Sequence, residues 1–339
     1  MRYEWFLLAA GVTLTSDAGA DEPIEKYQVV SPKDVGIEVT GMNGRGEVVG
    51  FEWADDVAQP GVVEQRPFLA RGKEVTYLPL LKGYTATFPA AVSDDGLVVG
   101  RASKPSPPRA RIQMRNQAFL WDAKGGIRGL GVLEEDRASF ASGIARDGRR
   151  ISGYSVGDDR VRACVWERAG DGWKANALPH ASRLGSNVVA ISGDGRYVAA
   201  VDGVSPCLWT LSPSGAWSRE VIGDNGSLIP RAVNDSGTVV GIRPNGDGQT
   251  DAVIWSREAG MRRLAKPEGY VRAEAFAVND AGTVVGLVDG PAGSDVGPNA
   301  FVFEGGRLRL LAEGGPAFAS ATAINDHGQV AGVMEEREP

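Results

Sequence analysis

The sequence predicts an all-β protein, a single β-propeller of seven blades of about 47 residues each. Three observations support this prediction. Glycine makes up 46 of the 339 residues, about twice its average share. A segment typical of a β-hairpin recurs seven times, and a second segment that ends in an aromatic residue follows most of its copies. Short strands in units of about 40 to 50 residues, repeated four to eight times, are typical of a β-propeller.

The first repeated segment predicts the first two strands of each blade. Residues 232–241, 277–286 and 323–332 share Ala, an apolar residue, Asn-Asp and Gly at fixed positions. Asn and Asp tolerate turn geometry and Gly supplies a positive φ, so the Asn-Asp-x-Gly element predicts a hairpin turn. The turn glycines are Gly46, Gly96, Gly148, Gly195, Gly237, Gly282 and Gly328.

A column of small residues follows the turn glycine at a distance of four positions. Another small residue lies five positions before the glycine, in the first strand. We interpret it as a sign that the first strand is the innermost one, where crowding around the central channel leaves little room for side chains. Apolar residues on both sides of the turn complete the pattern. The column after the glycine reads Gly50, Gly100, Ser152, Ala199, Gly241, Gly286 and Gly332.

The second repeated segment predicts the third strand, and a short apolar piece after a Gly-containing turn predicts the fourth. Its copies are residues 118–121, 163–166, 206–209, 252–255 and 300–303, with 67–70 as a weaker copy. We expect its Trp residues to pack between neighbouring blades. Residues 132–145 also fit an amphipathic helix, but their alignment with six other first strands favours a strand.

The two chain ends are predicted to close the ring. There are seven hairpins but six third-and-fourth pairs, so residues 27–30 are expected to join the last hairpin in a blade that lacks a third strand. Residues 1–20 predict a secretory signal, with Arg2, an apolar stretch and Ala18-Gly19-Ala20 before Asp21. The propeller domain would then be residues 21–339. The alternative is a native N-terminal strand, in which residues 5–8 could supply the third strand.

Composition narrows the partners. The net charge of −7 lacks the basic footprint of a nucleic-acid-binding protein, and no apolar run is long enough for a transmembrane helix. Two cysteines, Cys164 and Cys207, cannot form a disulfide framework and are expected to be small core residues. We expect a monomer without a metal or other cofactor, with carbohydrate or another surface protein as its partner.

The repeat resembles a known family. Ala-x-x-Ile/Val-Asn-Asp-x-Gly-x-Val-Val-Gly, followed by Ala-Phe-Leu-Trp at residues 118–121, is similar to the HAF-type extracellular repeat of bacteria. The resemblance covers about residues 37 to 334 and is weakest in the third and fourth copies, which lack Asn-Asp. The turn of the fourth copy looks more like that of WD-like and TolB-like propeller repeats. The resemblance implies an exported propeller (periplasmic, cell-surface or extracellular) and supplies no catalytic residue.

Two motifs suggest chemistry that their context does not favour. Residues 153–157 match the G-x-S-x-G nucleophile elbow, but they lie in a predicted second strand with no helix after it. The aspartates of the turns could suggest calcium, which needs six to eight oxygen ligands around one ion. Each lies on its own hairpin, so we do not expect them to converge, and we interpret them as turn formers.

The loops opposite the hairpin turns are the predicted location of function. The loop from Arg101 to Asn116 carries five basic residues and no acid, which favours a partner with carboxylate or phosphate groups. Links between blades add further polar residues, which we expect around the mouth of the channel. We predict a non-catalytic binding module; the alternatives are an enzyme acting on a carbohydrate polymer, with Glu135, Asp136 or His180 as acid–base groups, and a purely structural repeat. The candidate ligand-binding residues are Arg109, Arg111, Arg115, Glu135, Asp136, Arg137, His180, Arg183 and Arg272.

Overall fold

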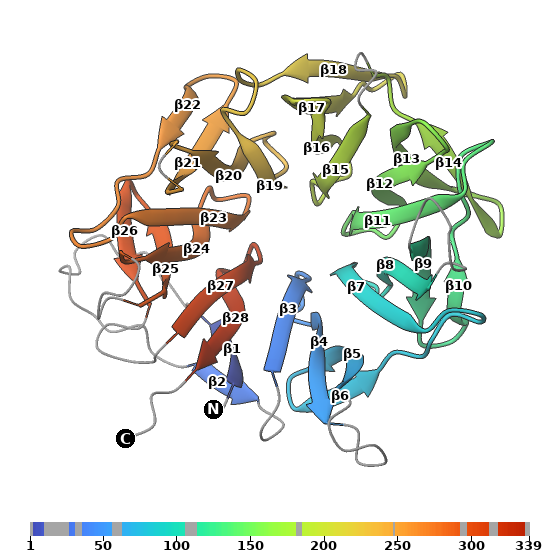
Figure 1. Cartoon of the computed structure of the whole chain (residues 1–339), viewed down its shortest axis with the longest axis horizontal. Helices are drawn as coiled ribbons and strands as arrows, with labels where there is room; N and C mark the ends of the chain where they lie inside the picture. Colours follow the sequence, from blue (N-terminus) through green and yellow to red (C-terminus); the bar gives the residue numbers. More distant parts are fainter. Residues whose placement is uncertain are drawn as a thin grey trace.

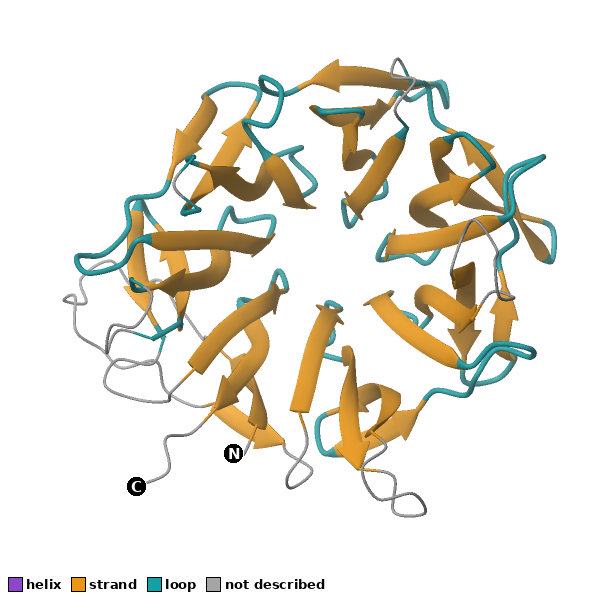
Figure 2. Cartoon of the chain, in the orientation of Figure 1, coloured by secondary structure: helices purple, strands orange, loops and turns teal. Residues whose placement is uncertain are grey.

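The computed structural model describes residues 3–9, 27–30, 36–55, 63–105, 114–180, 185–246, 248–291, 297–311 and 318–335. These residues form four-stranded antiparallel sheets arranged around a central channel (Figures 1 and 2). Within the described residues there is no helix, and accordingly none that could cross a membrane. The prediction of an all-β propeller is therefore confirmed.

Six blades are each built from four consecutive strands. The prediction of seven blades is wrong, because six sheets are built in this way and the remaining sheet is a composite of the two chain ends. The first three contiguous blades are β3 (Gly36–Met42), β4 (Val48–Asp55), β5 (Val63–Arg71) and β6 (Glu74–Tyr77); β7 (Ala86–Val92), β8 (Val98–Pro105), β9 (Met114–Asp122) and β10 (Gly126–Gly129); and β11 (Ala138–Ile144), β12 (Arg150–Val156), β13 (Val161–Ala169) and β14 (Gly172–Ala177).

The other three contiguous blades continue round the ring in chain order. They are β15 (Ser186–Ile191), β16 (Tyr197–Asp202), β17 (Ser205–Leu211) and β18 (Trp217–Val221); β19 (Ile229–Val233), β20 (Val239–Pro244), β21 (Thr250–Ser256) and β22 (Gly260–Arg263); and β23 (Arg272–Val278), β24 (Val284–Asp289), β25 (Asn299–Glu304) and β26 (Arg307–Leu310).

The closing sheet has the order β2-β1-β28-β27. The last hairpin, β27 (Phe318–Ile324) and β28 (Gln329–Glu335), pairs through β28 with β1 (Tyr3–Ala9), and β1 pairs with β2 (Tyr27–Val30). The expected fourth strand is present, but the prediction that the last blade lacks a third strand is wrong. β1 takes that place, because its backbone pairs with the otherwise open edge of β28 from Tyr3 opposite Glu335 to Ala9 opposite Gln329.

The hydrophobic core is divided into wedges that lie between neighbouring sheets. One cluster, for example, joins Val99 and Leu120 of the β7–β10 blade to Ile151 and Trp166 of the next blade. Another packs Val165 against Trp209. Trp166 and Trp209 have no exposed surface, so the prediction that the third-strand Trp residues pack between blades is confirmed for them. Cys164 and Cys207 are buried free thiols in the same wedges, and burial raises the pKa of each.

Every first strand contains a β-bulge about two residues before its turn. A bulge leaves one residue unpaired and redirects its side chain. Here the unpaired residues all line the channel. They are Thr40, Ala90, Ser142, Val189, Arg231, Phe276 and Thr322.

The column of small residues is real, but two of its predicted members are shifted by one position. In the third and fourth hairpins, Ile144 pairs with Ile151 and Ile191 with Val198, so two residues rather than one follow the turn glycine. In the other hairpins the small residue pairs with the residue just before the bulge, and here Gly153 and Ala200 take that position instead of Ser152 and Ala199. A Cβ at Gly153 would lie 1.9 Å from the carbonyl oxygen of Phe140.

Two glycines of the β23–β24 hairpin separate crowding from turn strain. A Cβ at Gly286 would lie 1.9 Å from the carbonyl oxygen of Glu274, whereas Gly282, with φ +84°, has nothing within 4 Å. We expect Gly286→Ala to lower the free energy of unfolding by about 3 kcal/mol, because the strand pair must separate. Gly282→Ala should cost only about 1–2 kcal/mol, the strain of a left-handed alanine. Urea unfolding measures both, and equal losses would contradict this account of the small column.

Candidate functional site

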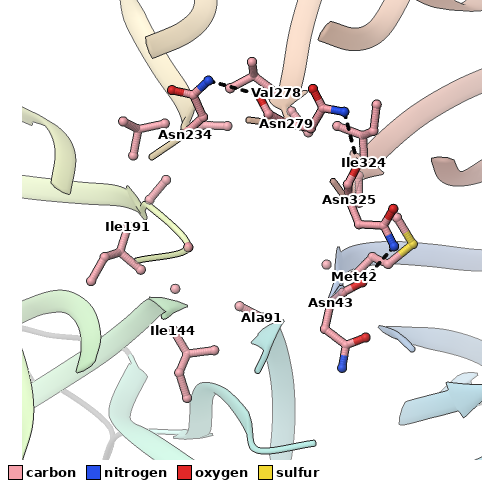
Figure 3. A pocket seen from close by; sticks show the side chains of 18 of the residues that line it. Met42, Asn43, Ala91, Ile144, Ile191, Asn234, Val278, Asn279, Ile324 and Asn325 are labelled. Atoms are coloured by element: carbon pink, nitrogen blue, oxygen red, sulfur yellow. Dashed lines mark hydrogen bonds between the residues drawn. The ribbon is translucent and has the colours of Figure 1, made fainter. Parts of the chain in front are cut away.

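The hairpin turns form a hydrogen-bonded ring around one end of the channel, which we call the turn ring. Its side-chain amides link consecutive turns: Asn234 Nδ2 donates to the carbonyl of Asn279 at 2.9 Å, and Asn279 Nδ2 to that of Asn325 at 3.2 Å (Figure 3). Asn325 Nδ2 donates to the carbonyl of Asn43 at 3.1 Å, which joins the last turn to the first. Asn43 Nδ2 continues to the carbonyl of Ser93 at 2.8 Å.

The turn aspartates supply a second set of links. The backbone N–H of Asp194 donates to Asp235 Oδ1, that of Asp235 to Asp280 Oδ1, and that of Asp280 to Asp326 Oδ1, each at 2.8 Å. Between the third and fourth turns the link is a backbone bond instead: the N–H of Arg146 donates to the carbonyl of Gly193 at 2.8 Å. The remaining links, from Gly44 to Asp94 and from Asp94 to Arg146, complete the circle.

Three of the turn aspartates converge, which corrects the prediction that they would not. The second carboxylate oxygens of Asp235, Asp280 and Asp326 all accept hydrogen bonds from the guanidinium group of Arg146, with Asp280 at 3.0 Å. Burial lowers the pKa of Arg146, but the hydrogen bond to Asp280 and the charges of Asp326, Asp280 and Asp94 outweigh it and raise the pKa above its usual range. Arg146 thus occupies the place that a cation would take. No group of metal-binding side chains is found among the described residues.

Removing Arg146 should leave three carboxylates facing one another. We expect Arg146→Ala to lower the free energy of unfolding by roughly 1–2 kcal/mol, less than a fully buried ion pair would cost because 35% of the side chain is exposed. Higher ionic strength should narrow the difference from the native protein, because salt screens the repulsion.

Arg149→Ala is the matched control for this measurement. Arg149 belongs to the same turn, but its side chain is 79% exposed and its nearest carboxylate oxygen is 3.9 Å away. Thermal unfolding of both variants at low and high salt checks the prediction. A loss for Arg146→Ala no greater than for Arg149→Ala would contradict it.

The opposite end of the channel opens into a cavity of about 550 Å³, which we call the mouth cavity. It lies on the side away from the hairpin turns, where the second-to-third-strand loops begin. Its wall consists of the first strands of four neighbouring blades and the second strands of three of them, together with Arg231 from the next blade. The lining residues are Glu38, Thr40, Phe51, Phe88, Pro89, Ala90, Arg101, Phe140, Ala141, Ser142, Tyr154, Asn187, Val188, Val189 and Arg231.

Aromatic rings form much of this wall. Phe140 and Tyr154 are cross-strand partners and stack with ring centroids 4.5 Å apart and an interplanar angle of 13°. Phe51 meets Phe88 edge to face at 6.0 Å. The guanidinium carbon of Arg101 lies 4.3 Å from the centre of the Phe88 ring, within the range of a cation–π interaction. The rings hold one another in place, so the wall is ordered before any ligand arrives.

Among the described residues that line the mouth cavity, three are charged: Glu38, Arg101 and Arg231. Desolvation by the concave wall raises the pKa of Glu38, although the charge of Arg101 opposes the shift. Desolvation also raises the pKa of Tyr154, again against Arg101, so its hydroxyl is neutral at physiological pH. Arg101 and Arg231 contribute guanidinium groups to the wall. The cavity can therefore stabilise an anion and offer hydrogen bonds to a polar ring.

Several of the sequence-predicted ligand residues lie outside the described residues or away from the cavity. Arg109, Arg111 and Arg183 belong to segments that the structure does not describe. Arg115 is in β9, opposite Lys104 of β8, and His180 is exposed after β14. Neither Arg115 nor His180 is among the lining residues of the mouth cavity.

The predicted link residues form ion pairs with neighbouring side chains. Figure 1 shows first strands such as β7, β11 and β23 running inward from the rim, so the links before them lie far from the turn ring. The buried carboxylate of Asp136 lies 2.9 Å from Arg162 and 3.5 Å from Arg160. The other predicted link residues pair as follows: Glu135 with Arg160, Arg137 with Asp158, and Arg272 with Glu274 and Asp289.

Ser155 is a structural residue, as its context predicted. It is fully buried in β12, where its hydroxyl accepts a hydrogen bond from the N–H of Leu133 at 3.1 Å and donates to the carbonyl of Ala138 at 3.3 Å. Its neighbour Tyr154 points to the other face of the strand and lines the mouth cavity. The G-x-S-x-G match therefore lies beside the candidate site without forming a nucleophile elbow.

The sequence interpretation missed Glu38, Phe88, Phe140 and Arg231. The first three occupy the position three residues before the small residue of their first strands, and Arg231 occupies the bulge position. Both positions vary from copy to copy, so they did not appear among the repeated columns. A signal was present nevertheless: Arg231 is the one charged residue at the seven bulge positions.

Comparison with known proteins supports the fold alone. No family model and no curated protein matches the chain. Among solved structures, puromycin hydrolase is 14% identical with a TM-score of 0.53, over 84% of this chain and 48% of that one. A structure from a study of two prolyl endopeptidases is 14% identical with a TM-score of 0.55, over 93% and 46%. A putative TolB from Agrobacterium tumefaciens is 13% identical with a TM-score of 0.47, over 100% and 99%. The chain spans about half the length of the two enzymes.

Proposed function

We propose that this chain is an exported propeller of the HAF-repeat type that acts as a non-catalytic binding module, with its ligand in the mouth cavity. One observation carries the proposal: an aromatic and basic cavity of about 550 Å³ opens at the loop end of the channel. This volume lies within the usual range for small-molecule sites, about 300–1,000 Å³. Preordered aromatic walls with a few polar groups are also typical of such sites.

The other end of the channel supports this assignment. There Arg146 bridges three carboxylates across the turn ring, and the turns are joined by short hydrogen bonds. Among the described residues that line that end, Phe276 is the one aromatic residue, whereas four aromatic residues line the mouth cavity. Binding through the loop end leaves the turn ring, and with it the fold, undisturbed.

Binding is favoured over the alternative of catalysis on a carbohydrate polymer. Most glycosidases use two carboxyl groups on either side of the scissile bond. The described lining of the mouth cavity contributes one, Glu38. Asp136, one of the acids predicted for the enzyme alternative, is held by Arg160 and Arg162. Its carboxylate is thus engaged within the protein.

An array of neutral and anionic glycans tests the binding function. We expect the native protein to bind a subset of the array, and Phe140→Ala or Tyr154→Ala to weaken that binding roughly tenfold, because either change removes half of the stacked wall. Tyr77→Ala is the control, since Tyr77 lies on the outermost strand β6 and is 48% exposed. Binding that survives both cavity changes would place the ligand elsewhere, and turnover of a bound glycan would favour the enzyme alternative.

Export has its own test. Signal cleavage after Ala20 would produce a mature chain that begins at Asp21, whereas residues 3–9 form β1 in the structure. Expression of the full chain in a bacterial host, followed by fractionation and N-terminal sequencing, distinguishes the two fates of this segment. Protein retained in the cytoplasm with its N-terminus intact would contradict export.

A further inference from the structure

Arg231 is the starting point of an inference about the ligand. It occupies the bulge of β19, between Pro230 and Ala232, and its exposed side chain lines the mouth cavity. Within the described residues Arg231 has no hydrogen bond or ion pair, unlike Arg146 at the other end of the channel. The other six bulge positions carry uncharged residues. The fold thus directs one unpaired guanidinium group into the channel.

A second guanidinium group lies in the wall of the same cavity. Arg101 covers the Phe88 ring at 4.3 Å and makes no ion pair with a carboxylate closer than 4 Å among the described residues. Among the described lining residues, the two positive charges of Arg101 and Arg231 exceed the single negative charge of Glu38. The mouth cavity is therefore locally positive on a protein whose net charge is −7. This contrast selects for an anionic group on the ligand.

The remaining surface is suited to a ring that carries hydroxyl groups. The Phe140–Tyr154 stack presents a flat apolar face, against which the C–H face of a sugar can pack. Hydrogen-bonding groups surround it: the hydroxyl of Tyr154, the amide of Asn187 and the carboxyl of Glu38. Arginine holds a planar carboxylate through two parallel hydrogen bonds. A doubly charged phosphate is less suited, because an ionised Glu38 repels two negative charges more strongly than the single charge of a carboxylate.

We propose that the mouth cavity binds an acidic sugar, with the sugar carboxylate held by Arg231 and Arg101 and the sugar ring against Phe140 and Tyr154. This inference rests on the proposed function, since it names the ligand class of the same site. It assigns Arg231 as the residue that selects acidic over neutral sugars. Glu38 lowers the affinity for the acid while it is ionised.

Calorimetry with paired probes tests the inference on the full chain. The probes are a glucuronic acid trisaccharide and its carboxyl-reduced counterpart, which has the same shape without the charge. We expect the native protein to bind the acidic probe at least tenfold more tightly, the range for losing a hydrogen bond to a charged group. Arg231→Gln should abolish most of this preference and leave the affinity for the reduced probe within about twofold.

Two further variants distinguish charge recognition from a general effect on the fold. Glu38→Gln should strengthen binding of the acidic probe several-fold, which loss of structure would not do. Arg243→Gln is the matched control, because Arg243 is an exposed arginine on β20 of the same blade and does not line the cavity. It should leave both affinities unchanged.

The possible results separate the ligand class from the site. If the two probes bind equally and Tyr154→Ala weakens both, the preference for an acidic sugar is overturned and the site is kept. Binding that Phe140→Ala and Tyr154→Ala leave intact would overturn the site itself. Tighter binding of glucose 6-phosphate than of glucuronic acid would show that the site selects a phosphate and not a carboxylate. No binding of either trisaccharide would overturn the proposed ligand class.

Discussion

The turn ring is the constraint on which the rest of the structure depends. Apolar wedges between the sheets supply most of the buried area, but hydrophobic packing is not directional and would tolerate several spacings of the sheets. The hydrogen bonds between turns are directional, and they join each hairpin to the next at 2.8 to 3.2 Å. They thereby fix the radius at which the hairpins meet around the channel.

The turn ring also explains why Asn-Asp recurs in the sequence. Asn279 Oδ1 accepts a hydrogen bond from the N–H of Thr283 within its own turn, while its Nδ2 reaches the next turn. Asp280 offers one carboxylate oxygen to the backbone of Asp235 and the other to Arg146. A residue that shapes its own turn and contacts the next one is difficult to replace. The repeat is most regular where this double role is present.

Much of the fold could be predicted because packing in a propeller is periodic. The third-strand Trp residues, the small column and the Asn-Asp turns meet the same environment in successive blades, so the same residue types recur. The exceptions have local causes. The extra residue after Gly148 and Gly195 shifts the small column by one, and turn length depends on hydrogen bonds that composition does not reveal. The composite sheet depends on pairing between residues more than 300 positions apart.

The mouth cavity could not be predicted in this way, and the reason lies in the same periodicity. Ring closure brings one position from each copy to a common axis, so residues that are 50 or more apart in sequence become neighbours. Glu38, Phe88 and Phe140 are equivalent positions of three copies, and in the structure they form one wall. Conversely, Glu135 and Asp136 are adjacent acids in the sequence, yet arginines from their own blade neutralise both.

In a closed repeat, the positions that differ between copies therefore carry the specific chemistry. A position that is identical in every blade gives the channel a uniform surface. Positions that vary between blades can instead bring an arginine, an acid and two aromatic rings to one cavity. Arg231 illustrates this argument, because a bulge shared by all the first strands directs it into the channel and its charge belongs to one strand alone. The repeated residues build the channel, and the residues that break the repeat determine what it can hold.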